Sequence, residues 1–380
     1  MSQRLPDVVV AGAGVFGACT AYFLRRQGYR VTLADAWGAG HPRGTSAGET
    51  RITRAGYGDR AVYTRWSRAA LGDWKQWQQE WQTELFHPTG VLWLAAKEND
   101  YVRDSVRVLA AEHVPVERLA IADVRRRFPQ FAALNSQLGY FEPEGGVLQA
   151  RKAVRAVVAA FERAGGTLRV AALAPPALAS GATRLDSVRT VDGEVIAGGV
   201  FVFACGPWLP ELFPKLLGKR ITVTKQEVFF FGAPRGSRDF EPPRFPAWID
   251  LEDEVGFYGV PSLDGRGVKI ASDHTGPPFN PTTGDRAPSA EGLAAVRTYL
   301  AERFPALKGA PLAETRVCQY ERTVNEHLVV DRHPEMENVW IAGGGSGHGF
   351  KLGPAVGREV AARVADGRRE AIPAKLRSLA

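Results

Sequence analysis

The chain has 380 residues, of which 45% are hydrophobic and 23% are charged, and its formal net charge is +7 at pH 7. This composition is typical of a soluble globular protein, and the length predicts two or three domains. No stretch approaches the roughly 18 consecutive apolar residues of a transmembrane helix, so we expect no membrane partner. The arginines are scattered along the chain, so we interpret the basic charge as a solvated surface and expect no nucleic-acid partner.

The cysteines indicate the kind of compartment. Cys19, Cys205 and Cys318 are too few for a disulfide framework in a chain of this length, and no Cys-x-x-Cys pair suggests a metal site. The first predicted strand begins within ten residues of Met1, which leaves no room for a signal peptide. We therefore expect a cytoplasmic protein without a metal.

The first predicted elements are a strand, a glycine turn, a helix and a second strand. Residues 8–11 form the first strand, and Gly12-Ala13-Gly14-Val15-Phe16-Gly17 forms the turn. A helical stretch follows the turn and ends at Gln27-Gly28, and the second strand ends at Asp35. This order of elements is typical of the start of a dinucleotide-binding fold.

Each conserved part of such a motif has a physical role. Gly12 permits a sharp turn, Gly14 permits a close approach of the backbone to a diphosphate, and Gly17 permits close packing of the helix on the strand. The helix N-terminus directs the positive end of its dipole at the phosphates. Asp35 can accept hydrogen bonds from ribose hydroxyls. We predict a dinucleotide site here, with an ordinary tight strand-to-helix turn as the alternative.

A tryptophan-rich helix follows a long loop over residues 36–50. Trp66, Trp74, Trp77 and Trp81 share one face of this helix with Ala70. We interpret the face as core packing rather than as a stack on a cofactor.

The pattern changes in the second half of the chain. Short alternating strands between residues 221 and 272 predict an antiparallel sheet, which differs from the parallel sheet expected at the N-terminus. A single buried strand is predicted over residues 195–204. Helices are predicted over residues 100–113, 151–164, 290–304 and 354–366.

A second glycine turn comes near the C-terminus. A strand over residues 339–342 leads into Gly343-Gly344-Gly345-Ser346-Gly347-His348-Gly349-Phe350-Lys351, and a helix follows. This arrangement again presents backbone N–H groups to an electron-rich group. Two such turns favour one long ligand, FAD, over NAD.

These patterns predict a two-domain α/β protein. We expect a Rossmann-like FAD-binding domain assembled from residues 1–85, 146–220 and 312–380. We expect an α+β substrate domain, built on an antiparallel sheet, from residues 86–145 and 221–311.

Over nearly its whole length the chain resembles the monomeric sarcosine oxidase, N-methyltryptophan oxidase and pipecolate oxidase family of FAD-dependent amine oxidases. The residues that carry the resemblance occur in order along the chain. They are Gly12 to Gly17 with Asp35, Gly48 to Arg54, Tyr258-Gly259-Val260-Pro261 with Lys269, Val317-Cys318-Gln319-Tyr320, Asn325-Glu326-His327, and Ser346 to Lys351.

The resemblance implies FAD as the cofactor, attached covalently through the sulfur of Cys318. Without the surrounding matches, Cys318 would be read as an inert buried cysteine. His348 is expected to shape its loop, with the backbone rather than the imidazole facing the flavin. The cofactor-binding residues that we predict are Gly12, Gly14, Val15, Phe16, Gly17, Asp35, Ser46, Arg51, Cys318, Gly345, Gly347, His348, Gly349, Phe350 and Lys351.

The resemblance also implies three catalytic residues. Lys269 matches a lysine that helps the reduced flavin react with dioxygen, because a fixed cation stabilises the developing superoxide. Arg51 is expected near the flavin ring, where it stabilises negative charge. Tyr258 is expected to flank the substrate amine. By pattern alone, Lys269 would be a solvated residue on an alternating strand.

The substrate-binding residues follow from the same resemblance. Arg54 and Lys351 match the pair that binds the substrate carboxylate, and the planar fork of an arginine suits this task. Surface ion pairing is the alternative for an arginine in this segment. Tyr258 and Tyr320 are expected beside the amine. Trp248 is expected in the pocket wall, with Trp93 and Phe230 as further candidates.

The chain also departs from the sarcosine enzymes. Asp273, followed by His274, stands where those enzymes often carry a histidine, and Glu321 stands where they carry a threonine. Two acids near the pocket disfavour a substrate with a second carboxylate and favour a cationic amine.

We therefore predict FAD-dependent oxidation of a secondary or cyclic α-amino acid, or a related amine, to an imine. Reoxidation by dioxygen would release hydrogen peroxide, and we expect a monomer. The alternatives are a dehydrogenase that uses another acceptor, a flavin-binding protein without turnover and an NAD-dependent enzyme.

Overall fold

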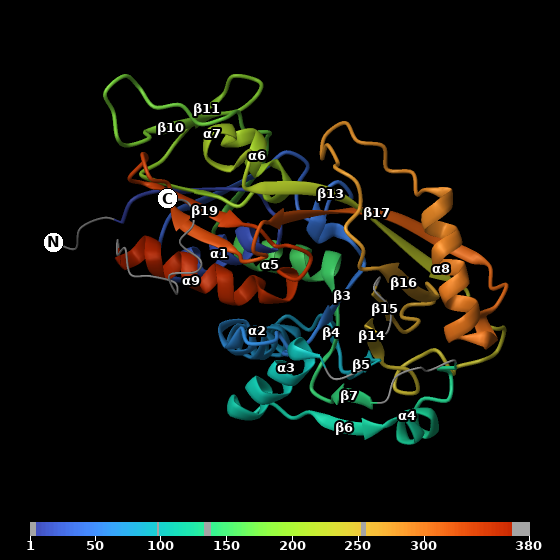
Figure 1. The fold of residues 1–380 in the computed structure, drawn as a ribbon. Helices are drawn as coiled ribbons and strands as arrows, with labels where there is room; N and C mark the ends of the chain where they lie inside the picture. The colour runs from blue at the N-terminus through green and yellow to red at the C-terminus, as the bar shows by residue number, and fades with distance from the viewer. Residues whose placement is uncertain (1–4, 97–98, 133–137, 252–255, 367–380) are drawn as a thin grey trace.

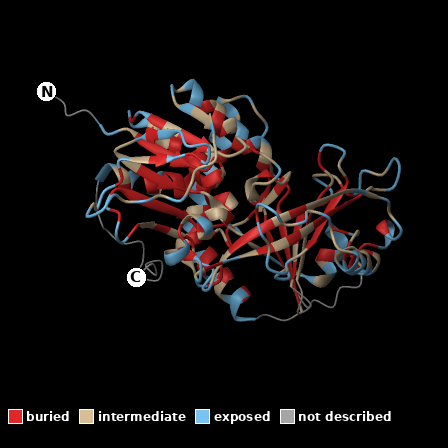
Figure 2. Cartoon of the chain, turned by 90° about the horizontal axis from the view of Figure 1, so that it is seen from above, coloured by how far each residue is buried: buried red, intermediate tan, exposed pale blue. Residues whose placement is uncertain are grey.

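The structure is a computed structural model that describes residues 5–96, 99–132, 138–251 and 256–366. Two large sheets dominate it, joined by a pair of long strands (Figure 1). Buried residues concentrate in the strands of both sheets, whereas the outer faces of the helices are exposed (Figure 2). None of the helices in this part of the chain is both long and apolar enough to cross a membrane.

The first sheet has six strands in the order β18-β19-β12-β1-β2-β9. All neighbouring pairs are parallel except β18–β19. Because central parallel strands are buried on both faces, β1, β12 and β19 consist of apolar residues and glycine. The bounds are β1 Val8–Ala11, β2 Val31–Asp35, β9 Thr167–Val170, β12 Val200–Phe203, β18 Val329–Arg332 and β19 Val339–Gly343.

Helices cover one face of this sheet. Helices α1 (Val15–Arg26), α5 (Ala150–Arg163) and α9 (Gly353–Asp366) lie together on it and share one hydrophobic core (Figure 1). The other face packs against the hairpin β10 (Ser187–Arg189) and β11 (Val195–Ala197) and the short helices α6 (Leu209–Leu212) and α7 (Pro214–Leu217).

The second sheet has eight strands in the order β17-β13-β16-β15-β14-β5-β7-β6. It is antiparallel except for the parallel pair β5–β14. Helix α8 (Ala290–Arg303) and helix α4 (Ile121–Arg127) pack on it. The bounds are β5 Val91–Ala95, β6 Glu117–Ala120, β7 Leu138–Glu142, β13 Ile221–Phe231, β14 Ala247–Leu251, β15 Phe257–Val260, β16 Val268–Ser272 and β17 Leu312–Thr323.

A small antiparallel sheet lies between the two large ones and carries the segment with Arg51. It has the order β3-β8-β4, with β3 Thr50–Thr53, β4 Phe86–His87 and β8 Gly146–Gln149. Two further helices, α2 (Ala61–Glu80) and α3 (Asp100–Ala111), lie beside it (Figure 1).

The predicted fold class is confirmed, since a Rossmann-like sheet is combined with a mainly antiparallel one. One predicted element is wrong: residues 195–204 do not form a single strand. Gly198 and Gly199 separate β11 from β12, and these two strands belong to different sheets. The predicted domain boundaries stay a prediction; β17 pairs within the eight-stranded sheet although it lies in a segment assigned to the FAD-binding domain.

The tryptophan helix is a core element, as predicted. Trp74 and Trp77 of α2 are buried against α1 and α9, and Trp66 and Trp81 pack at the edge of the same core. The indole nitrogen of Trp74 donates a hydrogen bond of 3.0 Å to the backbone oxygen of Lys351. The helix therefore positions the second glycine turn without touching the cavity.

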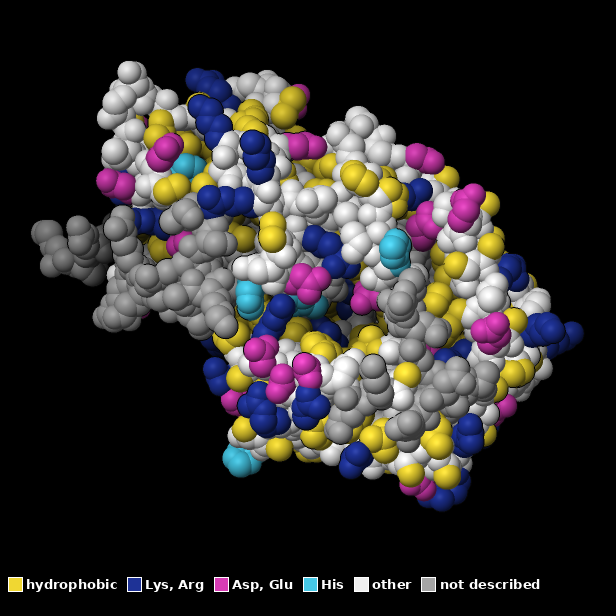
Figure 3. All heavy atoms as spheres, viewed as in Figure 1, with side chains coloured by type: hydrophobic (Ala, Val, Ile, Leu, Met, Phe, Trp, Pro, Cys, Tyr) yellow, Lys and Arg dark blue, Asp and Glu magenta, His cyan; other side chains and the backbone are white. Residues whose placement is uncertain are grey.

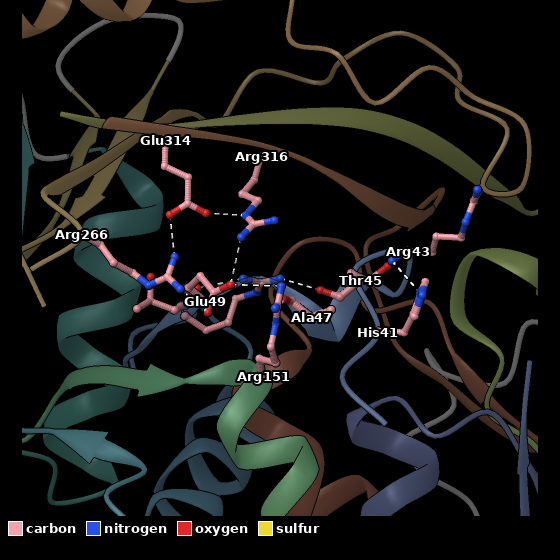
Figure 4. A network of polar contacts seen from close by, with 11 residues as sticks. His41, Arg43, Thr45, Ala47, Glu49, Arg151, Arg266, Glu314 and Arg316 are labelled. Atoms are coloured by element: carbon pink, nitrogen blue, oxygen red, sulfur yellow. Dashed lines mark hydrogen bonds and ion pairs between the residues drawn. The ribbon is translucent and has the colours of Figure 1, made fainter. Parts of the chain in front are cut away.

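An ion-pair network ties the two large sheets together at Glu49 (Figure 4). The Glu49 carboxylate lies 3.0 Å from Arg151 of α5, 3.5 Å from Arg266 and 3.4 Å from Arg316 of β17. Glu314 pairs with the last two arginines, at 2.5 and 2.6 Å. Three guanidinium groups are therefore paired with only two carboxylates.

We expect Glu49→Ala to lower the free energy of unfolding by about 2 kcal/mol, because it leaves several half-buried cations with one remaining acid. The side chain of Glu49 is only 13% exposed, so water replaces the lost pairs poorly. Urea unfolding followed by circular dichroism measures the change. Glu112→Ala, which removes the partner of the exposed Arg65, is the control and should cost less than about 1 kcal/mol. Equal effects would contradict a structural role for the network.

Candidate active site

A cavity of about 430 Å³ opens at the carboxyl ends of β1, β2, β12 and β19. Ligands of open α/β sheets bind at this edge. Both glycine turns line it, although they are more than 300 residues apart in sequence. Of the predicted cofactor-binding residues, the cavity is lined by Gly12, Gly14, Val15, Phe16, Asp35, Ser46, Arg51, Gly345, Gly347, Gly349 and Phe350.

The first glycine turn owes its shape to two glycines. Gly12 has φ +95°, and a Cβ there would lie 2.4 Å from the backbone oxygen of Ala204 in the neighbouring strand. A Cβ on Gly17 would lie 1.8 Å from the oxygen of Gly12, so Gly17 permits the close packing of helix on strand. Gly14 is the N-cap of α1, and the N–H of Val15 donates to Ser46 Oγ at 3.0 Å. The positive end of α1 therefore faces the cavity.

Asp35 is positioned by backbone N–H groups. It accepts hydrogen bonds from Ala13 at 2.7 Å and from Trp37 and Gly38 at 2.9 Å each. The rings of Trp37 and Trp208 lie 4.9 Å apart and line the cavity at this end. The sequence analysis missed both tryptophans, although Trp37 follows Asp35 closely enough to suggest a surface for an adenine ring.

The second glycine turn is fastened to β17. Ser346 donates its N–H to the backbone oxygen of Glu321 at 3.0 Å, and Gly345 donates its N–H to the Glu321 carboxylate at 3.2 Å. The His348 imidazole bonds to the oxygen of Glu326 at 2.9 Å, and its burial lowers its pKa to about 3. A neutral ring turned toward Glu326 leaves the backbone of the turn to face the cavity.

These features fit FAD. The glycine turn, the helix N-terminus and Ser46 provide a diphosphate cradle, and Asp35 provides a ribose acceptor. The second turn, Phe350 and Arg51 line the same cavity, where a further ring system can be held.

Arg51 and Cys318 lie together. The guanidinium donates to the backbone oxygens of Thr50 and Thr45, at 2.8 and 2.5 Å, and to Cys318 Sγ at 3.6 Å. It also lies 5.7 Å from the ring centre of Phe350. These contacts place a fixed positive charge beside the Cys318 sulfur. The two predicted roles of Arg51 stay predictions.

Lys269 lies on the strand next to Tyr258 and is 4% exposed. Its ammonium group donates to the oxygen of Thr50 at 3.0 Å and lies 5.8 Å from the ring centre of Tyr258. Burial, reinforced by the nearby charge of Arg51, lowers its pKa to about 7. It also lines a separate cavity of about 40 Å³, large enough for a molecule the size of water.

Arg54 and Lys351 are brought together by Tyr57. The guanidinium carbon of Arg54 lies 4.6 Å from the Tyr57 ring centre and 4.7 Å from that of Trp93. The ammonium of Lys351 donates to the Tyr57 hydroxyl at 2.8 Å. Burial, together with the charge of Arg54, holds the pKa of Lys351 well below its usual range. A guanidinium and a buried amine this close form a receptor for an anion, because a bound anion favours the charged form of the amine.

Glu142 positions this pair and was missed by the sequence analysis. Its carboxylate accepts from the N–H groups of Ala55 and Gly56, at 2.6 and 3.2 Å, and from the indole of Trp93 at 2.9 Å. It therefore fixes the turn after Arg54 and the ring below it. The sequence offered no signal, because Glu142 lies in a stretch that reads as an ordinary turn.

The two predicted tyrosines lie side by side, with their hydroxyl oxygens 3.2 Å apart. Burial raises the pKa of Tyr258 to about 12 and that of Tyr320 well above its usual range. Both phenols are therefore neutral and act as hydrogen-bond donors rather than as bases. On the face of the molecule that Figure 3 shows, acidic, basic and histidine side chains gather around a hollow.

Trp248 and Phe230, which were candidates for the pocket wall, do not lie beside Arg54. Trp248 is fully buried between Phe245 and Phe304 beneath the eight-stranded sheet, so the structure does not bring it to the site. The alternation of β14 directs it to the core face, which the sequence alone did not reveal. Phe230 lines the small cavity beside Lys269, whereas the ring centre of Trp93 lies 4.7 Å from the guanidinium carbon of Arg54.

The two acids that depart from the family pattern, Asp273 and Glu321, have different neighbours. Burial raises the pKa of Asp273, and the nearby charges of Arg322 and Arg54 oppose this rise. Glu321 points to the glycine turns instead of toward Arg54. Only Asp273 therefore remains a candidate for the substrate side.

Comparisons with known proteins show the family of the chain. The family described as FAD dependent oxidoreductase matches residues 7–363. The chain is similar to monomeric sarcosine oxidase of Bacillus sp. (strain B-0618), with 30% identity over 96% of this chain and 93% of that protein. It is 30% identical to N-methyl-L-tryptophan oxidase of Yersinia pestis (strain Pestoides F), over 98% of both chains.

The fold is similar to that of L-proline dehydrogenase from P. horikoshii, with a TM-score of 0.82, 22% identity, and coverage of 97% of this chain and 95% of that one. The family match spans both glycine turns and every residue of the cavity described above. The chain therefore belongs to the FAD dependent oxidoreductase family, with sarcosine and N-methyltryptophan oxidases among its relatives.

Proposed function

We propose that the protein oxidises a secondary or cyclic α-amino acid, or a related amine, to an imine, and that dioxygen is the final acceptor and yields hydrogen peroxide. Two observations carry the proposal: Tyr57 joins Arg54 and Lys351, and the phenols of Tyr258 and Tyr320 are paired. Asp273 is close enough to interact electrostatically with Arg54 and with both phenols. This arrangement suits a carboxylate with an amine next to it. The relatives named above act, by their names, on N-methyl amino acids.

Each group has its own role in the proposed reaction. FAD supplies the two-electron acceptor for the substrate when it is bound. Arg54 and Lys351 bind and orient the carboxylate, so the substrate is held in one position. Tyr258 and Tyr320 donate hydrogen bonds near the amine and exclude water. Lys269 holds a proton and a positive charge on the side where dioxygen is reduced.

We further propose that Cys318, whose sulfur lies 3.6 Å from Arg51, holds the flavin covalently through that sulfur. We also propose a monomer located in the cytoplasm. Three unpaired cysteines, two of them at or beside the cofactor cavity, suit a reducing compartment.

The test of the reaction uses the purified holoenzyme without oxygen. Sarcosine, L-proline, L-pipecolate and N-methyl-L-tryptophan are mixed with it in turn, and loss of the visible flavin absorption is recorded. Bleaching by at least one of them, with colour and hydrogen peroxide produced on admission of air, supports the proposal. Bleaching that only a dye reverses would establish a dehydrogenase, and absence of flavin would refute the proposal.

We expect Arg54→Lys to raise KM for an α-amino acid at least about 30-fold, which corresponds to roughly 2 kcal/mol for a buried charged contact. A lysine carries the charge but lacks the planar fork and the stacking on Tyr57 and Trp93. Steady-state oxygen consumption measures the change. An amine substrate without a carboxylate is the control and should be affected less than threefold. A uniform effect on both would contradict carboxylate binding by Arg54.

A further inference from the structure

Glu321 is a buried acid in the wall of the cofactor cavity. It lies near the end of β17 and is 6% exposed. Its Oε1 atom accepts the N–H of Gly345 at 3.2 Å. Its Oε2 atom is buried and has no hydrogen-bond partner in the part of the chain that the structure describes. Such an oxygen is costly to bury alone, so a bound group is expected to satisfy it.

The position of Oε2 indicates which part of the cofactor it faces. It would lie 3.6 Å from a Cβ on Gly206 and 3.5 Å from a Cβ on Gly343. Gly206 follows β12 and Gly343 ends β19, and these strands are neighbours in the parallel sheet. The first glycine turn adjoins Gly206, because a Cβ on Gly12 would lie 3.1 Å from the Cα of Cys205. On β17, Glu321 follows Cys318, the neighbour of Arg51, by three residues.

Between its diphosphate and its ring, FAD carries a chain of sugar-alcohol hydroxyls, which are hydrogen-bond donors. We propose that Glu321 is a cofactor-contacting residue: Oε2 accepts a hydrogen bond from one of these hydroxyls, and the carboxylate charge lowers the reduction potential of the flavin. This inference rests on the FAD binding proposed above. Reduction adds negative charge to the ring system, and a carboxylate nearby in a medium of low polarity opposes it.

The charges around Glu321 leave this effect uncompensated. From the end of β12 the Cys205 thiol faces it, and from the turn after β19 the N–H groups of Gly344 and Gly345 do. Burial raises the pKa of Glu321 to about 7, against the opposing effect of those N–H groups. A raised pKa means that the group is neutral below pH 7 and charged above it. The effect on the potential is therefore present at high pH and lost as the pH falls.

The experiment measures the midpoint potential of the holoenzyme against reference dyes between pH 6 and 9, which needs no amine substrate. In Glu321→Gln, the amide oxygen still accepts from Gly345, but the charge is gone. We expect its reduction equilibrium at pH 9 to be at least tenfold more favourable than in the wild type, about 30 mV for a two-electron couple. The two potentials should converge at pH 6.

Two variants test the cause. Glu321→Asp keeps the charge and should keep the pH dependence of the wild type. Glu314→Gln removes an acid from the same strand at the network of Figure 4, away from the cavity, and should leave the potential unchanged. If both proteins contain flavin but Glu321→Gln and the wild type have equal midpoint potentials at every pH, this inference is overturned and the proposed function is not. A purified protein without flavin would overturn the proposed function as well.

Discussion

Replacing Lys269 with methionine is expected to slow the reaction of the reduced enzyme with dioxygen by about 10²–10³-fold, the usual effect of removing one preorganised charge-stabilising group. The methionine keeps the volume of the side chain but removes the ammonium group that now bonds to Thr50. Reduction by substrate should be unchanged, because Arg54, Lys351 and the two tyrosines are untouched. Stopped-flow measurement of each half-reaction separates the two effects.

The small cavity beside Lys269 provides the matched control. Lys152 lines the same cavity but is exposed, so Lys152→Met removes one positive charge without removing the buried one. We expect less than a twofold change in that variant. Equal losses in the two variants would show that overall charge, rather than Lys269, governs the dioxygen reaction.

The same reaction should depend on pH. Burial lowers the pKa of Lys269 to about 7, so its charged form predominates below that value and is lost above it. The dioxygen rate should therefore fall as the pH rises through this pKa, and Lys269→Met should show no such fall. Negative charge on a reduced cofactor would move the midpoint upward, since an opposite charge favours the ammonium form.

Cys318→Ser is expected to abolish covalent attachment of the flavin completely. In the wild type, the yellow colour should stay with the acid-precipitated protein, whereas in the variant it should appear in the supernatant. A serine hydroxyl is a much weaker nucleophile than a cysteine sulfur, so it should not form the bond to the flavin.

The other cysteines show why Cys318 is singled out. Cys205 also lines the cavity, but burial raises its pKa, and nearby Asp35 and Glu321 raise it further. Burial likewise raises the pKa of Cys19 well above its usual range. Cys205→Ser should therefore leave the flavin with the protein. Colour lost from the pellet in Cys205→Ser, or kept there in Cys318→Ser, would reverse the assignment.

The two glycine turns and the change from parallel to antiparallel strands could be predicted because their signals are local. Turn glycines, apolar runs and alternating polar and apolar residues can each be recognised within a short stretch of sequence. The single buried strand over residues 195–204 was wrong because two adjacent glycines, which pattern reading tolerates, divide it between two sheets.

The site was predicted where residues matched a known family and missed where they depended on distant partners. Glu142 holds Arg54 through contacts that span 86 and 87 residues of sequence. Trp248 was placed at the pocket by its position in the chain, but the register of β14 turns it into the core. No local pattern reveals which face of a strand meets a ligand when both faces are apolar.

The cavity also fixes an order of assembly during synthesis. β1, α1 and β2 leave the ribosome early, but their neighbour β12 follows more than 150 residues later, and the second glycine turn comes after residue 340. A nascent chain therefore contains the first glycine turn, the proposed site of the diphosphate, long before it contains the second turn, the proposed site of the flavin ring. Chains released short of β19 should retain no flavin, and in cells starved of riboflavin the finished polypeptide should be an early target for proteases.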